Sequence, residues 1–147
     1  MSWWNKLFTG SEPDGRVDYY REGLELLEDA KFHEALTSFR LALKDAPGDP
    51  VILQQIAIAY TRIGMTEEAA KTYRHVLKNQ PDAPGAHYGL AFLYLRGGQR
   101  EEAVRHLRAF LGNAPSDPDA QEHVTHARTT LAELTEAGLG EGGLHGR

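Results

Sequence analysis

Apolar residues recur every three to four positions through most of this chain, which is the spacing that places side chains on one face of an α-helix. The stretch from 50 to 83 holds two such runs. The first helical face consists of Leu53, Ile56, Ala57 and Tyr60. The second consists of Ala69, Tyr73, Val76 and Leu77. Gly64 separates the two runs, Pro50 lies where a helix can begin and Pro81 where one must end. This stretch therefore predicts two helices joined by a tight turn.

The same pattern repeats along the chain with a period of 34 residues. Prolines recur in two sets, Pro47, Pro81, Pro115 and Pro50, Pro84, Pro118. Small residues recur at Gly23, Ala57, Ala91 and at Ala35, Ala69, Ala103, and large ones at Leu26, Tyr60, Tyr94 and at Phe39, Tyr73, Leu107. The turn position holds Ala30, Gly64 and Gly98. Because small positions stay small and large positions stay large, each unit predicts the same packing, with two helices in close approach and large side chains around them.

These recurring positions resemble the tetratricopeptide repeat, a 34-residue helix–turn–helix unit. Three repeats fit, at 16–49, 50–83 and 84–117, so the resemblance covers 102 residues. It implies an all-α fold, a right-handed α-solenoid in which the first helix of each pair lines a concave groove. The chain departs from the family pattern at the leading aromatic position, which holds Tyr19, Leu53 and His87 in the three repeats.

The segments outside the repeats predict a cap and two tails. Range 118–137 begins with another Asp-Pro helix start, and its apolar face predicts one helix that caps the array. Range 138–147 is rich in glycine with little to bury, so we expect a flexible tail. Range 1–15 predicts a short amphipathic segment followed by a linker. Four apolar side chains share one side of that segment and form an N-terminal anchor, Trp3, Trp4, Leu7 and Phe8.

Composition narrows the classes of function. The 147 residues carry 21 acidic and 16 basic side chains, a net charge of −5. We expect no nucleic-acid partner, because nonspecific binding to phosphates normally needs a basic face. The absence of cysteine excludes thiolate metal sites and thiol nucleophiles. No stretch approaches the roughly 18 apolar residues of a membrane span, and the start lacks a secretory apolar run, so we expect a cytoplasmic protein.

The sequence offers no catalytic constellation. His123 and His126 lie three residues apart, but two ligands do not make a metal site. Acidic pairs such as Glu67 and Glu68 recur at the 34-residue step in the first turn of a helix, where they favour the helix dipole. No phosphate-binding glycine loop and no nucleophile elbow is present. We expect a protein that is not an enzyme and that uses neither a cofactor nor a metal.

The resemblance implies that first-helix positions not used in packing line the groove. In chain order these are Tyr20, Leu24, Leu27, Gln54, Gln55, Ile58, Arg62, Tyr88, Phe92, Leu95 and Arg96. The capping helix would add Glu122, His123 and His126. So many large apolar side chains suit an apolar or amphipathic protein segment. The alternative is that contacts within the superhelix bury some of them. Arg62 and Arg96 share one register and are expected along one edge, where they either hold a ligand carboxylate or remain solvated.

One well-known binding mode of the family is missing. A subset grips a C-terminal carboxylate with Lys, Asn and Arg side chains. The matching positions here hold Tyr20, Leu24, Gln55, Gly85 and Gly89. The resemblance therefore does not extend to this carboxylate clamp.

The sequence predicts a non-catalytic adaptor or scaffold that binds an apolar or amphipathic segment of a partner protein in the concave groove. The alternative is a scaffold that self-assembles, or that attaches to the inner face of a membrane, through residues 1–8. Lys6 is the one basic residue in that segment, so docking on protein is favoured over docking on anionic lipid.

Overall fold

A computed structural model describes the backbone of residues 17–145 and the side chains of residues 17–136. This part of the chain consists of helices and turns. In order, the helices are α2 (Tyr19–Glu28), α3 (Phe32–Asp45), α4 (Pro50–Ile63), α5 (Thr66–Asn79), α6 (Pro84–Arg96), α7 (Arg100–Gly112), the short 3-10 helix η1 (Pro118–Ala120) and α8 (Gln121–His145). The N-terminal anchor lies outside the described residues.

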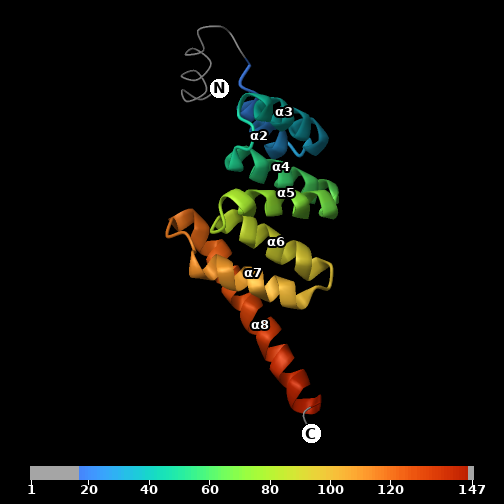
Figure 1. Cartoon of the computed structure of the whole chain (residues 1–147), viewed down its shortest axis with the longest axis vertical. Helices are drawn as coiled ribbons and strands as arrows, with labels where there is room; N and C mark the ends of the chain where they lie inside the picture. Colours follow the sequence, from blue (N-terminus) through green and yellow to red (C-terminus); the bar gives the residue numbers. More distant parts are fainter. Residues whose placement is uncertain (1–16, 146–147) are drawn as a thin grey trace.

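The helices stack in the order of the sequence and form an α-solenoid. Figure 1 shows the stack running from α2 and α3 at one end to α8 at the other, where α8 extends beyond the body. The most extensive helix contacts are those within the pairs α2–α3, α4–α5 and α6–α7. Each helix thus buries its apolar face against its neighbours in sequence, and the predicted all-α solenoid is confirmed.

The turn inside each helix pair has the same geometry in all three pairs. Ala30, Gly64 and Gly98 have positive φ angles of 61°, 92° and 77°. The following backbone N–H, of Lys31, Met65 or Gln99, donates to the carbonyl five residues earlier at 2.8 to 2.9 Å. This bond satisfies one of the carbonyl groups that a helix end leaves without a partner. The predicted turn position is confirmed.

The core follows the alternation of small and large residues. Ala35, Ala57 and Ala69 are fully buried at the helix crossings. Phe39 and Leu107 are also fully buried and fill the space beside such crossings. In the first repeat Gly23 takes the place of alanine, since a β-carbon there would come within 2.5 Å of the Phe39 ring.

Successive repeats are also joined by an arginine–tyrosine hydrogen bond at one register. The Arg40 guanidinium donates to the Tyr60 hydroxyl, and Arg74 donates to the Tyr94 hydroxyl at 3.0 Å. In both pairs a second helix contacts the first helix of the next repeat.

The C-terminal cap differs from its predicted boundaries. The segment opens with η1, and α8 then continues to His145, eight residues past the predicted end at 137. The backbone of residues 138–145 is thus helical where a flexible tail was predicted. Glycine lowers helix stability but retains its N–H, and no proline follows Pro118 to end the helix.

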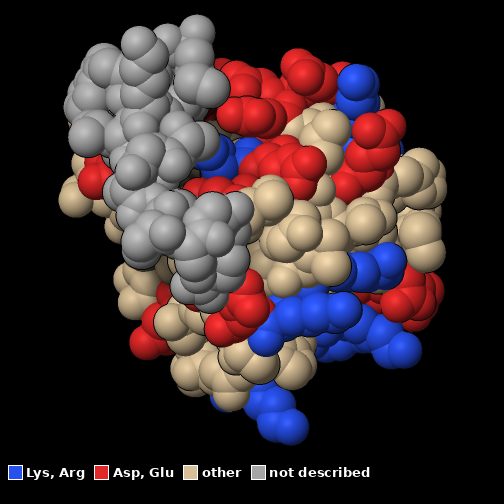
Figure 2. Space-filling view, turned by 90° about the horizontal axis from the view of Figure 1, so that it is seen from above, with Lys and Arg blue, Asp and Glu red and all other residues tan. Residues whose placement is uncertain are grey.

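The surface carries both charge signs in separate areas. Figure 2 shows the end of the solenoid formed by α2 and α3, where acidic side chains gather in the upper part of the view and Lys and Arg side chains form a band below. The first repeat holds eight acidic and five basic residues, which agrees with this acidic area. No helix in the described part of the chain is both long and apolar enough to cross a membrane.

Candidate functional site

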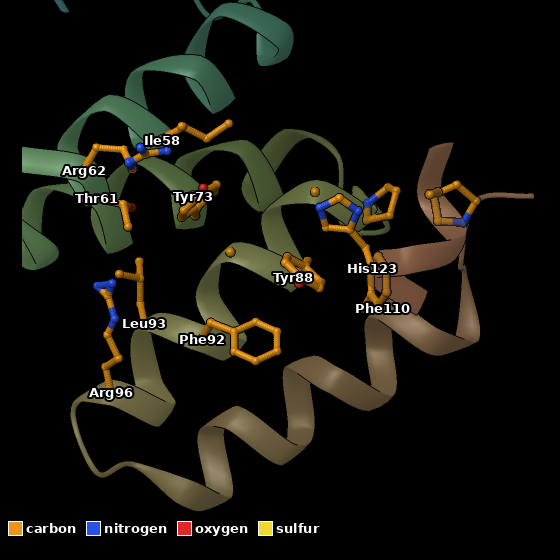
Figure 3. Close-up of a pocket in the computed structure, with 15 residues that line it drawn as sticks. Ile58, Thr61, Arg62, Tyr73, Tyr88, Phe92, Leu93, Arg96, Phe110 and His123 are labelled. Carbon is orange, nitrogen blue, oxygen red and sulfur yellow. The ribbon is translucent and has the colours of Figure 1, made fainter. Parts of the chain in front are cut away.

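A pocket of about 570 Å³ opens between α4, α6 and the start of the C-terminal cap. Figure 3 shows its side chains converging from these elements, together with Tyr73 of α5 and Phe110 of α7. The lining residues are Ile58, Thr61, Arg62, Tyr73, Pro84, Gly85, Tyr88, Gly89, Phe92, Leu93, Arg96, Phe110, Pro115, Ala120 and His123. Most of these side chains are apolar or aromatic.

An aromatic cluster forms one side of the pocket. The Tyr88 ring centroid lies 4.8 Å from Phe92, 5.1 Å from Phe110 and 5.0 Å from His123. Phe92 in turn stacks on His126 at 4.9 Å with an interplanar angle of 14°. Tyr88 and Phe92 remain half-buried, so each keeps ring surface available to a ligand. The two histidines of α8 therefore complete a surface whose centre lies on α6.

Two glycines on α6 let neighbouring side chains pack closely against the helix beside this pocket. Gly85 and Gly89 lie one helical turn apart and both line it. The Tyr73 ring occupies the space that a side chain at 89 would need, since a β-carbon there would lie 2.3 Å from the ring. Burial raises the pKa of Tyr73 to about 12, against a smaller lowering from its hydrogen bond with Thr61. The Tyr73 hydroxyl is therefore neutral and forms part of an uncharged wall.

One edge of the pocket is cationic. Among the described residues that line the pocket, Arg62 and Arg96 carry a permanent positive charge. Figure 3 shows both at the edge of the pocket away from His123. The Arg62 guanidinium lies 4.8 Å from the centroid of the Phe32 ring. That contact holds Arg62 by a cation–π attraction at the rim. The predicted shared edge of the two arginines agrees with their placement.

A shallower hollow continues from Tyr88 along α8. It is lined by Tyr88, Gln121, Glu122, His123, Thr125, His126 and Thr129. Burial raises the pKa of Tyr88, and the negative charge of Glu122 raises it further. The surface beyond Tyr88 therefore carries the negative charge of Glu122, whereas the Arg62 edge is cationic.

The structure brings some of the predicted groove residues together and separates others. Six of them line the pocket: Ile58, Arg62, Tyr88, Phe92, Arg96 and His123. Tyr20, Leu24 and Leu27 pack instead against the N-terminal core, where Tyr20 lies 6.0 Å from Phe39. The side chain of Gln54 reaches Gly85 behind the pocket wall, while Gln55 and Leu95 are half-buried outside it.

Several lining residues were not among the predicted groove positions. Tyr73 and Phe110 come from second helices, whose registers predicted core packing only. The sequence did contain one indication of this site, at Gly85 and Gly89. By comparison with the family pattern, these two residues show only that the carboxylate clamp is missing. Two glycines at i and i+4 in a helix remove side-chain volume from one face, so neighbouring rings become accessible there.

A histidine pair lies on the other side of α6. His87 Nε2 lies 2.7 Å from the Pro81 carbonyl, and His87 Nδ1 lies 3.0 Å from His106 Nδ1. A carbonyl only accepts, so His87 Nε2 is the donor to Pro81. One of the two Nδ1 atoms donates to the other. Burial, and to a lesser extent the neighbouring His87, lower the pKa of His106 to about 4. In the part of the chain with described side chains, no group of three His, Asp or Glu residues is placed to hold a metal.

Comparison with known proteins identifies the class of fold and then the family. The solenoid of paired helices is that of a helical-repeat protein. A tetratricopeptide repeat family model matches residues 26–83 and 64–126, which together exceed half of the chain. The chain belongs to the tetratricopeptide repeat family. Comparison with curated protein sequences gave no match.

Solved structures with a similar fold include chaperones of type III secretion. The translocator chaperone SycD of Yersinia enterocolitica superposes with a TM-score of 0.76 at 16% identity, over 84% of this chain and 86% of SycD. SycD in complex with a YopD peptide gives a TM-score of 0.75 at 16% identity, over 81% and 91%. PcrH in complex with the chaperone-binding region of PopD gives 0.73 at 17%, over 81% and 90%. At these identities the likeness shows the fold alone.

Proposed function

We infer that this protein is a non-catalytic adaptor that binds an apolar or amphipathic segment of a partner protein in the pocket between α4 and α6. The observation that carries this proposal is the open aromatic surface of Tyr88 and Phe92. Neither ring is fully buried, although the fully buried Leu90 shows that α6 can bury a large side chain. Membership of a repeat family and neighbours solved with partner peptides support a protein ligand.

The pocket has the size and chemistry for side chains of a peptide. Its volume of about 570 Å³ is in the range of small-ligand sites, and its lining is mostly apolar with a few polar groups. A fully buried large apolar side chain contributes roughly 1.5 to 3 kcal/mol. Two such anchors contribute about 3 to 6 kcal/mol, which only offsets the lower part of the estimated cost of association, so we expect a reversible complex.

The Phe92→Ala substitution tests this function. Twelve-residue random peptides displayed on phage are first selected on the wild-type protein, and the strongest binder is synthesised. We expect F92A to weaken that peptide by about tenfold, because the substitution removes half of the aromatic surface. Titration calorimetry measures the affinity, and circular dichroism confirms that the variant is folded.

A matched control uses an exposed side chain of α4. Val51 is 54% exposed and does not line the pocket, so V51A should leave the affinity unchanged. Full affinity of F92A for the selected peptide would contradict the proposed site.

The alternative role of the N-terminal anchor stays a prediction, because Trp3, Trp4, Leu7 and Phe8 lie outside the described residues. Both tryptophans of the chain belong to this anchor, so tryptophan emission reports on it alone. An emission maximum that shifts to the red on dilution would support self-association. Co-sedimentation with vesicles that depends on residues 1–8 would support membrane attachment.

A further inference from the structure

The pocket is electrically asymmetric along α6. Arg96, the last residue of α6, and Arg62 in the last turn of α4 lie at one edge. Tyr88 lies eight residues before Arg96, and beyond Tyr88 the surface carries Glu122. A segment that crosses the pocket therefore meets a cationic edge, an aromatic centre and an anionic end in that order.

We propose that the pocket binds its partner segment in one orientation, with an Asp or Glu side chain held by Arg62 and Arg96 and a large apolar side chain on Tyr88 and Phe92. This inference rests on the proposed function and specifies the chemistry of the partner. Arg62 and Arg96 are its specificity-determining residues.

The two arginines are available for a ligand carboxylate. Among the residues with described side chains, neither guanidinium forms an ion pair with an Asp or Glu. Arg62 rests on the Phe32 ring. The N–H groups of Arg62 point outward in the plane of the guanidinium, so this contact leaves them open to an acceptor. An arginine held in place loses less side-chain freedom when it binds a carboxylate, and charge-assisted hydrogen bonds are stronger than neutral ones.

The opposite end of the site disfavours a carboxylate. Glu122 lies close enough to Tyr88 to raise the pKa of its hydroxyl, so its field reaches the aromatic centre. An acidic side chain beyond Tyr88 would be repelled by Glu122, whereas one at Arg62 and Arg96 would be attracted. Charge patterns of this kind select the orientation and the partner more than they raise affinity.

The helix sets the spacing between the two features of the segment. Eight residues of α6 separate Tyr88 from Arg96, which is about 12 Å at the helical rise of 1.5 Å per residue. An extended segment advances about 3.3 Å per residue. The acidic residue is therefore expected about four positions from the apolar anchor.

The experiment compares peptide selections on full-length proteins with and without the two arginines at the cationic edge of the pocket. Random twelve-residue peptides displayed on phage are selected on the wild type, on R62Q/R96Q and on the control R108Q, whose arginine is exposed on α7 outside the pocket. We expect the wild-type and R108Q pools to be enriched in Asp or Glu about four positions from an aromatic or large aliphatic residue, and always on the same side of it in the peptide sequence. The R62Q/R96Q pool should keep the apolar anchor and lose the acidic preference.

A titration with one selected peptide gives the quantitative test. Changing its Glu to Gln should raise the dissociation constant about fivefold on the wild type and less than twofold on R62Q/R96Q. That difference should shrink at about 1 M salt, where screening acts over roughly 3 Å.

The outcomes separate this inference from the proposed function. The proposed orientation is wrong if the wild-type pool shows no acidic preference, or if that preference persists in the R62Q/R96Q pool. In either case, binding that is weakened by F92A still supports the proposed adaptor function. Peptides that bind F92A as well as the wild type contradict the pocket itself, and the inference is then lost with it. Circular dichroism of each variant checks the fold.

Discussion

Gly85 and Gly89 lie on the same face of α6, yet an added methyl group would meet different neighbours. At 85 it would approach Gln54 Oε1, the far end of a flexible side chain. At 89 it would lie 2.3 to 2.7 Å from ring atoms and the hydroxyl oxygen of Tyr73, which is 5% exposed and can shift only by losing packing contacts.

These neighbours predict opposite effects on stability. Gly85→Ala should be neutral or stabilising by up to about 1 kcal/mol, because alanine favours helix. Gly89→Ala should cost about 1 to 3 kcal/mol through overpacking and should weaken peptide binding as Tyr73 shifts. Urea unfolding of both variants provides the comparison, and equal stabilities would refute the role given to the Tyr73 ring.

At the scale of the elements, the turn between α2 and α3 is the strained one among the three turns that join the helix pairs. Ala30 has a φ of 61°, where the equivalent residues are Gly64 and Gly98. Alanine pays roughly 1 to 2 kcal/mol in the left-handed region, whereas glycine does not.

We therefore expect Ala30→Gly to stabilise the protein by about 1 kcal/mol, somewhat less than the strain because glycine also gains freedom in the unfolded chain. Thermal unfolding measures the change. Gly64→Ala is the reverse control and should destabilise the protein. A loss of stability in A30G would show that the turn is not strained.

The contact between α6 and α7 is expected to respond to pH through His106. Burial and the neighbouring His87, Arg105 and Arg74 lower the pKa of His106 to about 4, against an opposing effect of Glu102. The unfolded chain, with a histidine pKa near 6.5, therefore binds the proton more readily. The stabilisation is complete above pH 6.5 and is lost as the pH falls towards 4.

Allowing for solvent screening, this loss is on the order of 1 to 2 kcal/mol. The His106→Phe variant keeps a ring against Tyr94, which stacks on His106 at 5.5 Å, and removes the titration. Urea unfolding at pH 7 and pH 4.5 should therefore show a smaller loss in H106F than in the wild type. Identical losses would contradict the assignment.

At the scale of the whole molecule, α8 closes the apolar end of the solenoid. Val124 and Ala127 are buried against Leu107 and Phe110 of α7 and Ala91 of α6. Arg100 of α7 also donates a hydrogen bond to the Leu134 carbonyl. Without this helix the last repeat would expose an apolar face, as an uncapped repeat array does.

Truncation before residue 121 should therefore destabilise the protein by about 3 kcal/mol or more, from exposure of Leu107 and Phe110 alone. The melting temperature should fall on the order of 10 °C, and the protein should self-associate in gel filtration. A truncation after residue 136 keeps Val124, Ala127 and Leu134 and serves as the control. Equal melting temperatures of the two truncated proteins would show that α8 is not a cap.

Much of the fold was predictable because the information is local. Apolar spacing, proline and glycine positions and the 34-residue period follow from helix geometry and turn conformation, which neighbouring residues determine. They predicted the helix pairs and their turns, including the turn at Ala30. The end of α8 was not predictable from glycine content, because glycine weakens a helix without ending it.

The sequence by itself determined that this chain is a stack of helix pairs with one helix beyond the third repeat. Only the tertiary structure decided which first-helix residues form an open site. Tyr20 and Leu24 packed on the N-terminal core, whereas Tyr88 and Phe92 remained accessible beside Gly89. The reason is physical: an open pocket is the volume left between helices that are distant in sequence, and no local pattern records that volume.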